Sequence, residues 1–216
     1  MGSDSERGKG SCIVKMFEIS LRTRSAIFAV FEEDKPAVKK ATAFALSLPD
    51  PSNKTAATAT VILSSKPSDQ VDENNKYCTK LSKTTINFKE FSGSLVAKLS
   101  QQHSKHVTKC LTNCLTLGER DLKKIYMYVV QASKDEPKKY EVKRDATEGG
   151  NLYSLVLNDS ERSLARNQQL FIGAPVVARN KNLIGMVKSI TSTENGTVHL
   201  SVVEFTSEII NGKRSL

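Results

Sequence analysis

Short β-prone runs separated by turn residues are the feature of this 216-residue sequence that most constrains its fold. β-Branched and aromatic residues favour strands, and Gly, Pro, Asn and Asp favour the turns between them. Many such runs at regular spacing predict an antiparallel barrel or sandwich. The predicted strands lie at 25–31, 41–48, 58–64, 84–88, 94–99, 125–130, 152–157, 174–178, 183–190 and 197–203.

The last third of the sequence contains the clearest turn signal. Asn195 and Gly196 form the dipeptide most typical of a type I′ hairpin turn, and apolar runs flank it on both sides. The polar residues 68–76 and the charged residues 135–150 are predicted to be loops. A short C-terminal helix is predicted over 204–211.

The charge balance favours acidic partners but does not name one. Thirty-two Lys and Arg residues against 23 Asp and Glu residues give a net charge of +9. Lysines gather at 35–40, 105–109, 123–124 and 138–144, and tyrosines lie near two of these clusters. A basic, nucleic-acid-binding β domain is therefore one alternative for the function. No Gly-rich phosphate-binding motif is present.

The sequence carries no signal for a membrane or for export. No apolar run approaches the roughly 18 residues of a transmembrane helix, and charged residues interrupt the apolar runs near the N-terminus. Four cysteines are too few for a disulfide scaffold, so we expect free thiols and an intracellular, cytoplasmic or nuclear protein. Residues 1–24, which open on a polar stretch rich in Gly and Ser, are expected to be flexible or poorly ordered.

One cluster has the side-chain types that zinc prefers, and it consists of His103, His106, Cys110 and Cys114. On a single helix these residues would share a face. A rise of about 1.5 Å per residue would spread them over roughly 16 Å, which is too far for one tetrahedral ion. We therefore predict an amphipathic segment without a metal, and no other cofactor. His199 lies between apolar neighbours on a predicted strand and is expected to face solvent.

Three segments resemble the trypsin-like serine peptidases. Residues 171–187 begin Phe-Ile-Gly-Ala-Pro-Val-Val and resemble the family's nucleophile segment, Gly-Asp-Ser-Gly-Gly-Pro followed by a hairpin. Residues 41–46 resemble its Gly-x-Gly-Phe strand, with Ala in place of both glycines. Residues 61–66 resemble the strand end that carries its catalytic histidine. The order and separation of the segments fit the compact, HtrA-like members of the superfamily.

The resemblance implies an all-β fold of two packed, antiparallel, six-stranded β-barrels with a short C-terminal helix. The first barrel would span 25–118, after the N-terminal segment 1–24. The second barrel, with the helix, would span 119–216.

The resemblance also places unreactive residues at the catalytic positions. Ile172 falls where the family has its serine, and Lys66 falls where it has its histidine; Asp121 is the nearest candidate, by order, for the third triad member. An aliphatic side chain forms no acyl-enzyme, and a base without a nucleophile gives no covalent catalysis. Phe171 and Ala174 stand in the oxyanion segment, which needs a glycine-permissive backbone. The resemblance thus implies a catalytically inactive pseudopeptidase that acts as a protein-binding or scaffold module.

Such a module could bind an extended peptide by strand addition beside residues 186–192, and Met186 and Lys188 are the predicted contact residues. An active peptidase with a different triad is the second alternative. No serine stands in a Gly-x-Ser-Gly context. The nucleophile would have to be Ser160, Ser163 or Ser189, and the base His103, His106 or His199.

Overall fold

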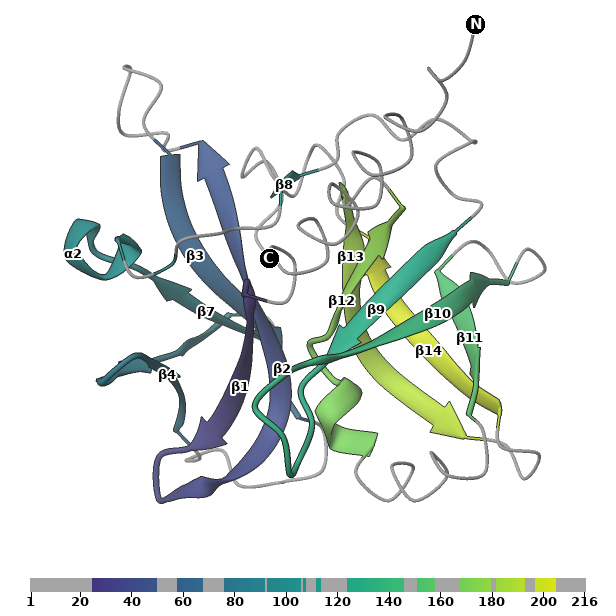
Figure 1. Ribbon diagram of the computed structural model, residues 1–216, viewed down its shortest axis with the longest axis horizontal. Coiled ribbons are helices and arrows are strands. Elements are labelled where there is room, and N and C mark those ends of the chain that lie inside the picture. The colour runs from purple at the N-terminus through teal and green to yellow at the C-terminus, as the bar shows by residue number, and fades with distance from the viewer. Residues whose placement is uncertain are drawn as a thin grey trace, which may run out of the picture.

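The computed structural model contains two β-barrels that lie side by side, one built from the first half of the chain and one from the second (Figure 1). The structure describes residues 25–49, 58–67, 76–91, 93–105, 107, 112–113, 124–145, 151–157, 168–179, 182–192 and 197–204. Within these ranges the α-helix is limited to one turn, α2 (Gln101–Ser104). No helix in this part of the chain has the length and apolar character needed to cross a membrane.

The first sheet has the strand order β5-β4-β1-β2-β3-β7-β6. Its two end strands, β5 and β6, are separated only by Phe88, whose N–H donates to the Tyr77 carbonyl at 2.9 Å. They are therefore two parts of one bent strand, which closes a six-stranded barrel. The strands are β1 (Ile27–Glu32), β2 (Lys35–Pro49), β3 (Thr58–Ser65), β4 (Tyr77–Leu81), β5 (Thr84–Asn87), β6 (Lys89–Phe91) and β7 (Ser94–Lys98).

The second sheet has the order β12-β9-β10-β11-β14-β13-β8, and β12 also pairs with β13. That pairing closes a second six-stranded barrel, so the predicted all-β double barrel is confirmed. The strands are β9 (Ile125–Val129), β10 (Lys138–Arg144), β11 (Leu152–Val156), β12 (Pro175–Ala178), β13 (Asn182–Ser192) and β14 (Thr197–Glu204).

A short additional strand, β8 (Thr112–Asn113), pairs in parallel with the start of β13. It lies between the barrels in Figure 1 and belongs to the second sheet, ahead of the division that we expected between residues 118 and 119. The expected flexible segment 1–24 lies outside the described residues. So does the predicted C-terminal helix beyond Glu204, which is itself the last residue of β14.

Four strands were not predicted: β4, β6, β8 and β10. β10 lies within the charged segment that we expected to be a loop, and its side chains alternate: Tyr140 and Val142 are buried, whereas Lys139 and Glu141 are exposed. This period of two is the pattern of a strand with one face on a core. Of the other missed strands, β4 pairs with β1 and β5, and the short strands β6 and β8 pair with β7 and β13.

The larger hydrophobic core crosses the boundary between the barrels. It joins Tyr153, Met127 and Leu200 of the second barrel to Phe44 and Leu46 of β2 in the first. A second buried cluster fills the first barrel. Because β2 contributes side chains to both clusters, its backbone lies where the two barrels meet.

Candidate functional site

Ile172 is carried by the second barrel but is buried in the core of the first. A 3₁₀ turn at 168–171 precedes it, and its N–H donates to the Gln169 carbonyl at 3.0 Å. Its carbonyl accepts a 2.9 Å bond from the Thr42 N–H of β2. The residue is 5% exposed and belongs to the same buried cluster as Ile62 and Leu95. A hydrocarbon therefore fills this position.

At the next residue, Gly173, the second barrel's chain lies in close contact with β2 and β3 of the first barrel. Its φ is +76°, a left-handed conformation that favours glycine. A Cβ here would overlap the Thr42 carbonyl oxygen and the Ser64 hydroxyl oxygen, and it would lie 2.9 Å from the Ser65 nitrogen. The segment that carries Ile172 and Gly173 thus lies directly against the end of β3.

The Thr42 hydroxyl of β2 forms hydrogen bonds with the segment before Ile172 and with the residue that follows β9. It donates to the Leu170 carbonyl at 2.6 Å and accepts from the Val130 N–H at 3.1 Å. The Ser64 hydroxyl donates to the Thr42 carbonyl at 2.7 Å. Thr42 and Ser64 are both fully buried, so each bond satisfies a group that has no access to water. Together these bonds position the turn that carries Ile172.

Lys66 follows the last residue of β3 and forms an ion pair with Glu90 of β6. The Nζ–Oε2 distance is 2.8 Å, and the side chains are 24% and 47% exposed. The Lys66 N–H donates to the Gly93 carbonyl at 3.0 Å, in the turn between β6 and β7. The structure therefore places an ammonium group beside a carboxylate at the end of β3.

Asp121 lies outside the described residues, so its assignment stays a prediction. Glu90 was not considered from the sequence. It lies in a three-residue strand whose side chains are all exposed, which gives no periodic signal. Glu90 comes close to Lys66 only because β6 pairs with β7 and β7 pairs with β3, the strand that leads to Lys66.

The two predicted peptide contacts, Met186 and Lys188, have different environments. Met186 is 3% exposed and belongs to the larger core, so its side chain is buried and only its backbone could contact an added strand. Lys188 is exposed. The register between β13 and β14 shifts between Val187 and Ser189, and this bulge turns Lys188 away from the core.

The His–Cys segment does not form the single helix that we considered. α2 ends at Ser104, and His106, Cys110 and Cys114 lie outside the described residues. Within the described ranges no group of three or more His, Cys, Asp or Glu residues is placed to hold a metal. His103 lies near the Ser100 hydroxyl, with 3.2 Å between Nδ1 and Oγ.

His199, predicted to lie on a solvent-facing side of its strand, is half-buried. Its Nδ1 is buried without a hydrogen-bond partner. Cys78 of β4 is buried and is not part of a disulfide. Burial, followed by the charge of Glu33, raises the pKa of the Cys78 thiol, whereas Lys80 lowers it. An elevated pKa disfavours the nucleophilic thiolate.

Solved structures with the same fold are proteases of the trypsin-like class. The MamO protease domain of Magnetospirillum magneticum matches with a TM-score of 0.54 at 11% identity, covering 89% of this chain and 97% of that one. The Rv3671c protease of M. tuberculosis, in an inactive form, matches with a TM-score of 0.54 at 9% identity, covering 93% and 92%. A serine protease of a human pathogenic astrovirus matches with a TM-score of 0.52 at 12% identity, covering 84% and 91%.

The chain therefore has the trypsin-like, double-barrel fold of the serine peptidases. Identities this low establish the fold alone. No family model and no curated protein sequence matches the chain.

Proposed function

We propose that this chain is a catalytically inactive domain of trypsin-like fold that binds a protein partner. The observation that carries the proposal is the buried hydrocarbon of Ile172, beside Gly173 and the end of β3. Covalent acyl transfer requires a nucleophilic heteroatom with a base in hydrogen-bond reach. Isoleucine supplies no such atom.

The ion pair of Lys66 supports the same proposal. A general base must offer a lone pair to the proton that it removes. The Glu90 carboxylate, 2.8 Å from Nζ, stabilises the protonated ammonium, which has no lone pair. The pair therefore stabilises the local structure without activating a hydroxyl.

A fluorophosphonate probe tests the absence of a reactive serine. We expect no covalent label on the purified chain under conditions in which trypsin is labelled completely. Labelling of one serine, located by mass spectrometry and abolished by its substitution with Ala, would establish the active-peptidase alternative. Of the three candidate serines, Ser160 and Ser163 lie outside the described residues. Ser189 is exposed, so the probe could reach it.

The edge of β13 is the proposed binding site. β12 pairs with β13 only up to Met186, and a further backbone bond joins the Val187 N–H to the Ala174 carbonyl at 3.0 Å. Beyond that point, residues 189–192 pair with β14 on one side, and no described strand pairs with them on the other. Unpaired N–H and C=O groups of this kind can accept an added peptide strand.

A peptide-display selection on the immobilised chain tests this site. Peptides recovered there should bind the Lys188→Glu variant more weakly, because Lys188 is the charged, exposed side chain at the bulge. Lys83→Glu is the matched control, since Lys83 is exposed in the turn between β4 and β5 of the first barrel. Equal affinity of selected peptides for both variants would contradict the proposed edge.

The basic nucleic-acid-binding alternative predicts a different result. It requires binding to a generic duplex or single strand that weakens steeply as salt is raised. No binding at about 50 mM salt would dismiss it.

A further inference from the structure

The loop between β9 and β10 forms a pocket that the proposed function does not use. The pocket has a volume of about 620 Å³. Three of its lining residues are lysines: Lys134, Lys138 and Lys139. The others are Gln131, Asp135, Glu136 and Pro137.

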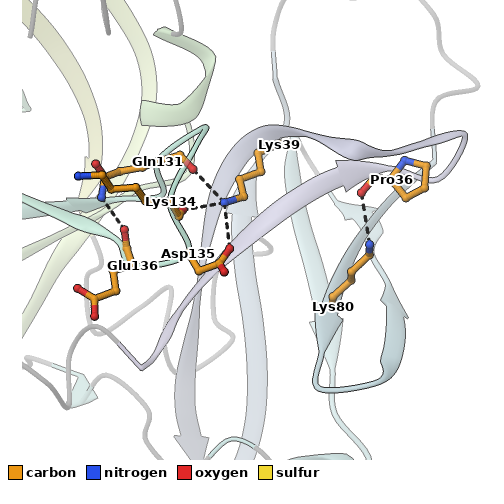
Figure 2. A network of polar contacts seen from close by, with 7 residues as sticks. All are labelled: Pro36, Lys39, Lys80, Gln131, Lys134, Asp135 and Glu136. Atoms are coloured by element: carbon orange, nitrogen blue, oxygen red, sulfur yellow. Dashed lines mark hydrogen bonds and ion pairs between the residues drawn. The ribbon is translucent and has the colours of Figure 1, made fainter.

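Lys39 of the first barrel holds this loop in place (Figure 2). Its Nζ donates to the Gln131 carbonyl at 2.9 Å and to the Lys134 carbonyl at 2.8 Å, and it lies 3.7 Å from Asp135 Oδ1. The Gln131 side-chain amide donates to the Glu136 carbonyl at 2.7 Å, which links the two sides of the loop. A loop that is already ordered loses less conformational entropy when it binds a ligand.

Aromatic rings hold two of the lysine charges near the pocket. Lys139 Nζ lies 3.6 Å from the centroid of the Tyr126 ring, and Lys138 Nζ lies 5.1 Å from the centroid of the Tyr140 ring. A cation–π contact orients the ammonium group but leaves its positive charge intact. The two lysines begin β10, so a strand fixes their backbone positions.

We propose that this pocket binds an acidic segment of a partner protein, whose carboxylates contact Lys134, Lys138 and Lys139. The site is separate from the β13 edge, and it goes beyond the proposed function by adding a second docking surface. The overall charge of +9 would promote the approach of such a partner.

The mixture of charges favours a peptide over a nucleic acid. Asp135 is fully exposed to solvent, and Glu136 is exposed beside it. A phosphate backbone carries a charge at every step and would be repelled by these carboxylates, whereas a peptide places carboxylates only at particular side chains. The nearby rings offer little to bases, because Lys139 covers Tyr126 and Tyr140 is buried.

Fluorescence anisotropy with a labelled peptide of alternating Glu and Ala residues tests the proposal. We expect saturable binding at low ionic strength, with no binding of the corresponding Gln–Ala peptide. In the Lys134→Gln, Lys138→Gln double variant the affinity should fall about tenfold, because two exposed charge pairs are lost. Lys134→Gln alone keeps Lys138 and its contact with the Tyr140 ring, so the affinity for the peptide should fall by a smaller factor.

The matched control is the Lys83→Gln, Lys98→Gln double variant, which removes the same charge from exposed positions of the first barrel. It should retain wild-type affinity. The proposal fails if the Glu–Ala peptide does not bind, or if both double variants lose affinity equally. It also fails if duplex DNA or vesicles containing phosphatidylserine bind more tightly than the peptide through the same lysines.

Discussion

Substitution of Gly173 by Ala tests the tight contact between the barrels. A left-handed backbone costs a residue with a Cβ about 1–2 kcal/mol. The added methyl group would also overlap Thr42 O and Ser64 Oγ and approach Ser65 N. Two of these atoms belong to the backbone, so the contact is relieved only if the strands move, and overpacking of this kind typically costs about 1–3 kcal/mol. We expect the free energy of unfolding to fall by about 2–5 kcal/mol.

Gly93 is the matched control for this experiment. Its φ is +75°, but no atom lies within 4 Å of the position that a Cβ would take. Gly93→Ala should therefore show only the backbone cost, about 1–2 kcal/mol. Urea unfolding followed by circular dichroism measures both variants, with the m-value checked for two-state behaviour. Equal destabilisation by the two substitutions would refute the argument that Gly173 is required by the packing of the barrels.

Three further predictions follow from the buried residues. Ile172→Ala should lower the free energy of unfolding by about 2–5 kcal/mol in the same urea assay, because it leaves a cavity in the core of the first barrel. Thr42→Val should cost about 2–4 kcal/mol by leaving the Leu170 carbonyl and the Val130 N–H without the hydroxyl, whereas Thr42→Ser should retain most of the stability. Because the folded state raises the pKa of Cys78, it binds the thiol proton more tightly than the unfolded state does. Stability measured across pH should then fall as pH rises past the ordinary thiol value of 9.0, and Cys78→Ala should remove that part of the slope.

The sequence predicted the strands that are rich in β-branched residues and failed where charge hid the pattern. Lys138, Lys139, Lys143 and Arg144 made β10 look like a loop, although Tyr140 and Val142 keep the inward alternation. A strand with one solvated face can carry many charges, so composition alone was a poor guide here.

The candidate site could be predicted only in part, because its geometry depends on distant pairings. The positions of Lys66 and Ile172 came from motifs in their own segments. The ion-pair partner of Lys66 could not be predicted from such a motif, because Glu90 comes close to Lys66 only through the pairing of β7 with β3. The different environments of the Met186 and Lys188 side chains could not be predicted either, because a bulge interrupts the alternation between them and leaves little trace in a single sequence.

The bond from the Thr42 hydroxyl to the Leu170 carbonyl joins residues 128 positions apart. During synthesis the first barrel therefore leaves the ribosome long before the segment that covers its inner face exists. Until residues 168–174 are made, the Thr42 hydroxyl lacks the Leu170 carbonyl, and the buried cluster of the first barrel lacks Ile172. Non-local contacts of this kind form slowly, and a hydrophobic face that waits for them is exposed to aggregation in the meantime.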